Sequence, residues 1–409
     1  MDNLSIFGWM ILVVSWVIAL GWTWRVSVAI RGFARMPDLL KRPVNRSVTR
    51  AGDSPVMSVV VPARNEEKAI ETTLRSLFRV IGVPLEIVAV DDRSTDGTGR
   101  IMDHLAEEIK NGKTATRHSY KVIHIDNLPA GWMGKTHAMA TAARLTTAPW
   151  LLFTDGDVMF REDSLARALT YVDRVAADHL VLFPTLTLRS RGERMMVGFL
   201  QVFAVWCSRP WRASNPNSPR DFLGIGAFNM IRRSTYESIG GFEALRMEVL
   251  EDLRLGYEVK KRKLRQHVVM GHNLLRIHWA EGAMGVVNNL TKNAFAIFRF
   301  HLWLIVAAMV GVGMLCVLPL LGLFFIQSGG LWIVFPSLIM LLALAAMYEF
   351  YKRYTGTSFV YALTFPFAAC LFLYALGQSL TMTLRGGGVT WRGTFYPLQE
   401  LRKQCGPLW

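Results

Sequence analysis

Four long runs without a charged side chain place the strongest constraint on the fold of this chain. They cover residues 4–24, 302–325, 331–347 and 357–384. A helix of about 20 apolar residues crosses the hydrocarbon core of a bilayer, so runs of this kind are typical of transmembrane helices. Hydrophobic residues make up 52% of the chain, which is too apolar for an ordinary soluble enzyme. We therefore expect one N-terminal and about three C-terminal transmembrane helices.

The charges that follow the first run predict its orientation. Residues 25–50 contain seven basic side chains and one acidic side chain. Because basic flanks stay on the cytoplasmic side, the N-terminus should face outward and the next domain inward. The run has no basic residue before it and no small-residue cleavage site after it, so we interpret it as a retained anchor rather than a secretory signal. The sequence thus predicts a multi-pass protein of the inner (cell) membrane.

The C-terminal tail conflicts with four full crossings. Four crossings would put the tail outside, yet it is mainly basic, with Arg385, Arg392, Arg402 and Lys403 against Glu400. The last apolar run contains Pro366 and ends in a triple glycine at 386–388, which is compatible with a re-entrant or broken helix. The side of the membrane on which the tail lies therefore stays open.

The stretch between the first two apolar runs has the pattern of an α/β domain. Strands are predicted at 57–61, 85–90, 121–125 and 150–153, and helices lie between them. We expect Asn65 to cap the first helix, and Ser94 or Thr95 to cap the second. Alternation of strands and helices indicates a mostly parallel, covered sheet whose ligands bind beyond the carboxyl ends of the strands.

These patterns divide the chain into five parts. They are an N-terminal anchor (residues 1–30), a basic linker (31–54), a cytosolic α/β domain (55–298), a transmembrane bundle (299–384) and a tail (385–409). Polar clusters follow three predicted strands, at 62–66, 91–97 and 154–157. No glycine-rich dinucleotide or P-loop motif follows the first strand, which argues against oxidoreductases and P-loop enzymes.

Carboxylates in these clusters suggest chemistry, although each has an ordinary alternative. Asp155 and Asp157 flank a glycine, so both can turn toward one hard cation that also binds phosphates, or they can form a simple turn. Asp91 and Asp92 would repel each other if both were buried, unless a cation or a ribose relieved the charge; a solvated turn is the alternative. Another pair, Glu251-Asp252, can supply a general base or merely cap a helix.

Taken in order, these motifs resemble family 2 glycosyltransferases with the GT-A fold, over roughly residues 55 to 280. The resemblance is carried by Pro62-Ala-Arg-Asn-Glu66, Asp91-Asp92, Asp155-Gly-Asp157, Gly240-Gly241-Phe242 and Glu251-Asp252. The membrane layout narrows it to the ceramide glucosyltransferase-like, hopanoid-associated and carotenoid glycosyltransferases. Residues 128–135 and the tail segment 388–396 are similar to a loop and a tail of that group.

The resemblance implies a role for each matched residue. The donor would be bound by Pro62, Arg64, Glu66, Asp91, Asp92, Lys135 and Asp155. Asp157, with Asp155, would ligate Mg²⁺ or Mn²⁺, and Asp252, beside Glu251, would deprotonate the acceptor hydroxyl. The family's Gln/Arg-x-x-Arg-Trp motif is missing after Glu251-Asp252. We expect Asn289, Lys292 or the tail pair Trp391-Arg392 to replace it and to contact acceptor or phosphate.

The implied reaction is an inverting transfer of a sugar from a nucleotide diphosphate, expected to be UDP, to an acceptor hydroxyl. Residues 195–211 are apolar and flanked by arginines, so they form either an interfacial segment beside lipid phosphates or an amphipathic core helix. With the anchors, this favours a membrane lipid as acceptor. The net charge of +15 accompanies no nucleic-acid motif, so no nucleic-acid partner is expected. The alternatives are a processive polysaccharide synthase, a polyprenyl-phosphate glycosyltransferase and a non-catalytic scaffold.

Overall fold

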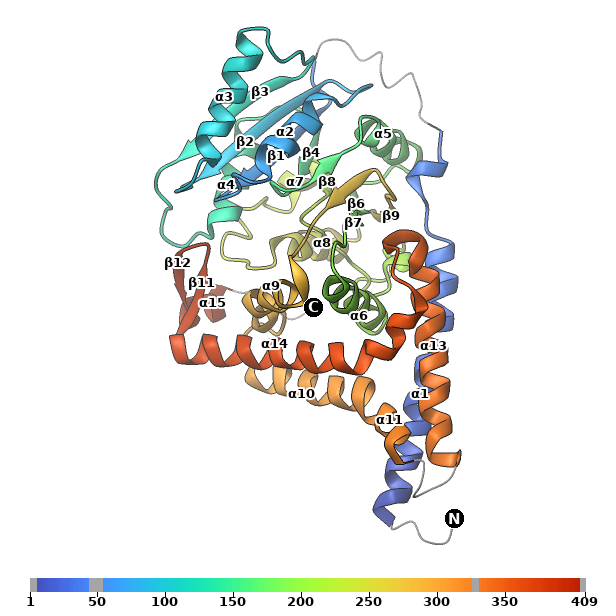
Figure 1. The fold of residues 1–409 in the computed structure, drawn as a ribbon. Coiled ribbons are helices and arrows are strands. Elements are labelled where there is room, and N and C mark those ends of the chain that lie inside the picture. Colours follow the sequence, from blue (N-terminus) through green and yellow to red (C-terminus); the bar gives the residue numbers. More distant parts are fainter. Residues whose placement is uncertain (1–5, 44–53, 326–330, 405–409) are drawn as a thin grey trace.

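The computed structural model describes residues 6–43, 54–325 and 331–404. An α/β domain occupies one end of the molecule, and long apolar helices occupy the other (Figure 1). The basic residues Arg46 and Arg50 of the predicted linker lie outside the described residues.

A seven-stranded sheet forms the centre of the α/β domain, in the order β3-β2-β1-β4-β8-β6-β9. The strands are β1 (Met57–Ala63), β2 (Leu85–Asp92), β3 (Ser119–Ile125), β4 (Trp150–Phe153), β6 (His179–Phe183), β8 (Asn229–Arg232) and β9 (Gln266–Met270). All neighbours pair in parallel except β8, which is antiparallel to both β4 and β6. The predicted parallel sheet is confirmed, and the carboxyl ends of its parallel strands share one edge.

Helices cover both faces of the sheet because its strands are apolar on both sides. Val59 and Val61 of β1 pack against one set of helices, whereas Val60 between them packs against the other. The first set is α2 (Ile70–Phe78), α3 (Thr98–Lys110) and α5 (Ser164–Val175). The second is α4 (Gly134–Arg144), α7 (Arg233–Ser238) and α8 (Glu251–Lys261).

The two predicted helix caps are wrong. Helix α2 begins at Ile70 and α3 at Thr98, and neither has a side-chain cap. The Asn65 side chain instead accepts a hydrogen bond from the Thr95 N–H (2.8 Å), and the Ser94 hydroxyl accepts one from the Asn65 N–H (3.1 Å). These polar side chains therefore tie the loops after β1 and β2 to each other.

Four apolar helical stretches in the described part of the chain are long enough to cross a membrane: Gly8–Ala34, Leu302–Leu321, Val334–Thr355 and Phe359–Gly386. They comprise α1 (Ile6–Ala34), α10 (Leu302–Val312) with η4 (Gly313–Val317) and α11 (Leu318–Leu321), α13 (Leu331–Thr355), and η6 (Phe359–Thr364) with α14 (Phe365–Gly386). Helix α1 continues ten residues past the predicted end at Trp24. Within it, Arg25 is buried and donates a hydrogen bond to the Val205 carbonyl.

The apolar helices run in two directions. Helices α1 and α13 lie side by side and extend away from the sheet, whereas α10 and α14 run crosswise beneath the α/β domain (Figure 1). Between α14 and the domain lie α6 (Arg191–Cys207) and α9 (Gly282–Ile297). One face of α6, including Phe199 and Val202, is buried among these helices, as the core-helix interpretation of residues 195–211 predicts.

The tail folds back onto the α/β domain. It forms a hairpin of β11 (Gly388–Trp391) and β12 (Thr394–Pro397), followed by α15 (Leu398–Gln404). The Gly134 N–H at the start of α4 donates to the Tyr396 hydroxyl (3.3 Å). The tail therefore packs against the same α/β domain whose loops carry the predicted site residues.

Candidate active site

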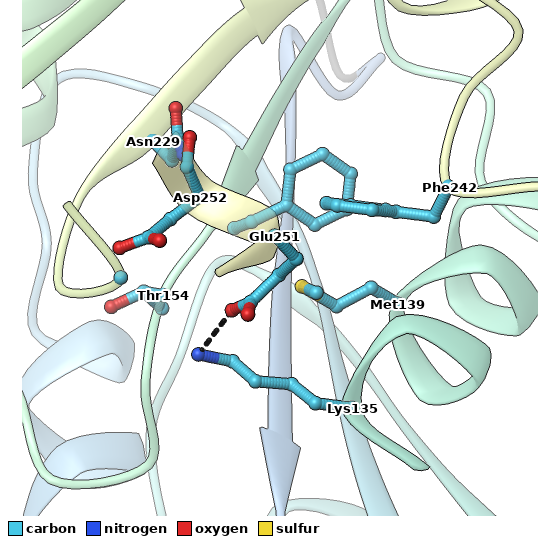
Figure 2. Close-up of a pocket in the computed structure, with 9 residues that line it drawn as sticks. Lys135, Met139, Thr154, Asn229, Phe242, Glu251 and Asp252 are labelled. Carbon is cyan, nitrogen blue, oxygen red and sulfur yellow. Dashed lines mark hydrogen bonds and ion pairs between the residues drawn. The ribbon is translucent and has the colours of Figure 1, made fainter. Parts of the chain in front are cut away.

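A largely buried ammonium group joins three segments of the chain at the carboxyl edge of the sheet. Lys135 Nζ lies 2.6 Å from Asp155 Oδ1 and 2.7 Å from Glu251 Oε1. Lys135 comes from the first turn of α4, Asp155 follows β4, and Glu251 begins α8. Figure 2 shows Lys135 and Glu251 pointing toward each other, with Asp252 beside them. The structure therefore brings together four residues predicted for catalysis and donor binding.

Two glycines allow a neighbouring loop to approach these carboxylates. A Cβ atom at Gly226 would clash with the Asp155 carboxylate, and one at Gly224 would clash with the backbone carbonyl of Asp252. The Asp155 N–H also donates to the Gly226 carbonyl (3.1 Å). Close backbone approach of this kind needs glycine. The loop before β8 thus contacts both the Asp155-Gly-Asp157 triplet and the start of α8.

Burial and charge shift the pKa values of this cluster. Burial lowers the pKa of Lys135, but Asp155 and Glu251 together outweigh it, so the pKa is raised and the ammonium stays charged. Burial raises the pKa of Asp155, yet Lys135 more than offsets this and holds it below its usual range. For Asp252, burial raises the pKa above its usual value despite the opposing effect of Lys135. A carboxylate with a raised pKa is a stronger base.

Asp157 has the environment expected of a cation ligand. Its Oδ1 atom is buried and has no hydrogen-bond partner among the described residues. Burial, followed by the charges of Asp155 and Glu66, raises its pKa to about 7. A hard divalent cation relieves such a carboxylate, so the donor set fits Mg²⁺ or Mn²⁺.

The described residues do not form a metal cage of their own. No three His, Cys, Asp or Glu side chains among them converge closely enough to hold an ion. This agrees with the mode in which one or two carboxylates bind the cation and substrate phosphates complete its coordination.

Asp91 and Asp92 point to opposite faces of β2, as successive strand residues do. Asp92 is buried and pairs with Arg93 (2.8 Å), beside Gly134 of α4. Asp91 lies against Gly99 of α3, and its Oδ2 atom is 3.2 Å from His124 Nδ1. The condition for repulsion, burial of both carboxylates without a partner, is therefore not met: only Asp92 is buried, and each has its own cationic or hydrogen-bonding partner. Only Asp92 lies on the α4 side with Lys135.

Three arginines meet where the tail hairpin covers the loops after β1 and β2. Arg392 lies 3.7 Å from Glu66, and Arg93 donates to the Thr394 hydroxyl (3.4 Å). Arg64 lies next to the hairpin turn; its Nε and Nη1 atoms are buried and have no hydrogen-bond partner among the described residues. Burial, then the charge of Arg93, lowers the pKa of Arg64. An anion would relieve this crowding of positive charge.

Several of these contacts were not predicted from the sequence. Arg93 directly follows Asp91-Asp92 in the sequence. Its position next to a predicted donor-binding pair is the signal that could have identified it. Thr394 and Tyr396 belong to the tail, whose return to the domain leaves no local pattern.

The other predicted residues lie as follows. Pro62 is buried in β1 opposite Val90 of β2. Trp391 is half-buried against a cluster formed by α9, α10, α14 and the tail. Among the candidates for the missing motif, Asn289 donates to the Trp279 carbonyl (2.8 Å), and Lys292 is exposed on α9. Within the described contacts, Arg392 is the candidate that reaches a predicted donor residue.

Comparisons with known proteins agree with this geometry. Residues 58–253 match the family model described as Glycosyl transferase family 2. A 4,4'-diaponeurosporenoate glycosyltransferase of Staphylococcus haemolyticus is 24% identical over 202 residues, which cover 49% of this chain and 50% of that protein. The enzyme of the same name from Staphylococcus aureus (strain USA300) is 21% identical over 58% of this chain and 60% of its own length. The alignments thus span only about half of these relatives.

A solved structure has a similar fold. It is a mannosyltransferase from Pyrobaculum calidifontis in complex with GDP-Man and Mn²⁺. The two structures superpose with a TM-score of 0.53 at 17% identity, over 91% of this chain and 99% of the other. The similarity confirms the predicted GT-A fold.

Proposed function

Since residues 58–253 are a family 2 glycosyltransferase domain on the GT-A fold, we propose that this glycosyltransferase moves a sugar from a UDP-sugar to a hydroxyl group of a membrane lipid, with inversion at the anomeric carbon. The observation that carries the proposal is the cluster of Lys135, Asp155, Glu251 and Asp252 at the carboxyl edge of the sheet, which faces the apolar helices.

The proposed reaction is a single displacement. The acceptor oxygen forms a bond to the anomeric carbon while the bond from that carbon to the diphosphate breaks. Asp252 accepts the hydroxyl proton, which its raised pKa favours. Glu251 positions Lys135, and the ammonium of Lys135 stabilises the negative charge that develops on the departing diphosphate.

The donor side has complementary charges. Arg64, Arg93 and Arg392 provide guanidinium groups for the diphosphate, and Glu66 and Asp92 provide oxygens for the ribose. Pro62 would border the uracil. In this proposal Arg392 replaces the missing Gln/Arg-x-x-Arg-Trp motif. A divalent cation held by Asp157 and Asp155 would neutralise further charge on the diphosphate.

The membrane side supports a lipid acceptor. Helices α10 and α14 lie beneath the α/β domain (Figure 1). Ile305 of α10 and Leu376 of α14 belong to the same apolar cluster as Val249, which lies three residues before Asp252. The names of the Staphylococcus relatives pair a glycosyltransferase with 4,4'-diaponeurosporenoate, which agrees with an apolar acceptor. The orientation that fits is a cytoplasmic α/β domain at the inner membrane, where nucleotide sugars are made.

Lipid analysis tests this function. Cells that express the full chain or Asp252→Asn would be extracted and their lipids compared by mass spectrometry, with Asp163→Asn as the control. Asp163 pairs with Arg161 and Arg167 at the start of α5 and does not line the site. A hexose-bearing lipid in the wild type and control alone supports the proposal. Long polymers would indicate a processive synthase, and an unchanged lipid profile would favour a scaffold.

A further inference from the structure

A second cavity lies between the α/β domain and the apolar helices. It has a volume of about 190 Å³ and is walled mainly by apolar side chains. Its walls include Phe33 of α1, Phe183 of β6, Ala204 of α6, Leu223, Met270 of β9 and Tyr351 of α13. We name it the helix-side cavity.

The helix-side cavity lies on the same sheet edge as the active site. Phe183 and Met270 are the last residues of β6 and β9 and pair with each other in register. These strands run in the same direction as β1, β2 and β4, whose carboxyl ends carry the donor-site residues. The charged cluster therefore occupies one half of this edge, and the apolar cavity occupies the other half.

One short loop joins the two halves. Leu223 lines the helix-side cavity, Gly224 lies against the backbone of Asp252, and Gly226 lines the small void beside Lys135. Four consecutive residues thus lead from the cavity wall to the proposed base.

The walls suit an apolar chain. Phe33 and Tyr351 belong to the two helices that extend away from the domain, so a chain can reach the cavity along them without entering water. Gln201 and Ala204 are only partly buried, which leaves the cavity accessible. The lining has few polar side chains: Gln201, Ser208, Thr355 and the hydroxyl-bearing Tyr351 and Tyr354. The Oε1 atom of Gln201 is buried and has no hydrogen-bond partner among the described residues. A water-soluble sugar acceptor would need many more polar partners than this lining provides.

We propose that the helix-side cavity binds the hydrocarbon chain of the lipid acceptor, so that the acceptor hydroxyl extends past Leu223 to Asp252. This inference rests on the proposed function and adds to it where the acceptor enters and how it is oriented. In this arrangement the sugar donor binds at the carboxyl ends of β1, β2 and β4. The lipid acceptor approaches the same sheet edge from the carboxyl ends of β6 and β9.

Filling the cavity tests the inference. Ala204→Phe adds bulk inside the cavity, and Cys207→Phe places the same side chain on the same helix at an exposed position that does not line it. Both variants and the wild type would be assayed in nanodiscs for lipid glycosylation and for donor hydrolysis. We expect Ala204→Phe to lower the ratio of glycosylation to hydrolysis at least about tenfold, and Cys207→Phe to leave it unchanged. Equal ratios in all three proteins would overturn the inference.

Photocrosslinking gives a readout that does not depend on turnover. The probe is a long-chain fatty alcohol with a diazirine near the end of its chain, added to nanodiscs that contain the full chain. We expect label on peptides that contain Phe183 or Tyr351, and less label in Ala204→Phe than in Cys207→Phe. Label confined to the outer surfaces of α1 and α13, equal in both variants, would refute the inference. If cavity labelling occurs but no protein turns over any nucleotide sugar, the proposed function fails, and with it the assignment of the bound chain to an acceptor.

Discussion

Arg392, in the hairpin at the end of the chain, lies 3.7 Å from Glu66, which follows the first strand of the sheet. The intervening chain contains the rest of the α/β domain and the last three apolar stretches. The proposed donor site is therefore assembled from residues that lie far apart in the sequence. This relationship gives the tail a direct part in the proposed reaction.

Arg392→Asn should weaken donor binding about tenfold or more, because a charge-assisted contact with the diphosphate is lost. Asn is the informative substitution because Arg392 and Gly393 have φ of 46° and 77° in the two-residue hairpin turn, and Asn accepts such values well. Isothermal titration with UDP and Mn²⁺ measures the change. Arg385→Asn, which removes an exposed tail cation at the end of α14, should bind UDP normally. Equal affinity in both variants would remove Arg392 from the donor site.

Asp252→Asn should lower kcat about 10²–10⁴-fold while donor affinity stays within about twofold, since the lost group acts as a base rather than a donor contact. Single-turnover transfer from a UDP-sugar measures the rate, and titration with UDP measures the affinity. If Asp252→Asn lowered the transfer rate and the UDP affinity by the same factor, Asp252 would have a structural role instead.

Lys135→Met should destabilise the protein by roughly 3–5 kcal/mol, because Asp155 and Glu251 lose their buried cationic partner. Protonated carboxyls need no such partner, so the loss should be smaller at acidic pH than at pH above neutral. Thermal unfolding in detergent at both pH values measures it, and Lys135→Arg serves as the charge-conserving comparison. A loss independent of pH would mean that packing, not charge, dominates.

Asp157→Ala should raise the Mn²⁺ concentration needed for half-maximal transfer about tenfold or more, since a carboxylate ligand is removed. Chelation of divalent ions should abolish transfer by the wild type, and added Mn²⁺ should restore it. Asp163→Ala, which removes a carboxylate that pairs with Arg161 and Arg167 and does not line the site, is the control and should leave the Mn²⁺ requirement unchanged. A normal requirement in Asp157→Ala would exclude Asp157 as a ligand.

Acid should destabilise the sheet beneath the active site through His179. Burial lowers its pKa from 6.5 to about 4, although its hydrogen bond with Asn229 opposes this. Between these values the unfolded chain binds the proton and the folded chain does not, so stability is lost as pH falls from 6.5 to about 4. The loss amounts to about 3 kcal/mol. Urea unfolding across this range should show a flatter profile for His179→Gln than for the wild type, and His104→Gln, an exposed residue, should not alter it.

The sequence predicted the parts of the fold that depend on local pattern. Strand β4 was predicted at its observed bounds, and the parallel sheet and GT-A fold are confirmed. The helix caps were wrong because Asn65 and Ser94 form hydrogen bonds between loops about thirty residues apart. Propensity for a cap does not show which backbone group a side chain will meet.

The candidate site was predictable in membership but not in geometry. Motif order identified Lys135, Asp155, Glu251 and Asp252, which the fold brings together. The sequence pattern did not show that Lys135 links Asp155 to Glu251, or that Arg93 joins Arg392 beside the tail. Likewise, apolar length predicted four helices long enough to cross a membrane, but it did not show that α10 and α14 run crosswise to α1 and α13 (Figure 1).

The late position of the hairpin has a consequence for biosynthesis. The ribosome makes the α/β domain and every apolar helix before it makes Arg392 and Tyr396. In the proposed function, a nascent chain would therefore still lack the part of its donor site that Arg392 supplies. The proposed donor site would be complete only after the hairpin has folded onto the loops that follow β1 and β2, so a chain still on the ribosome should not turn over nucleotide sugars.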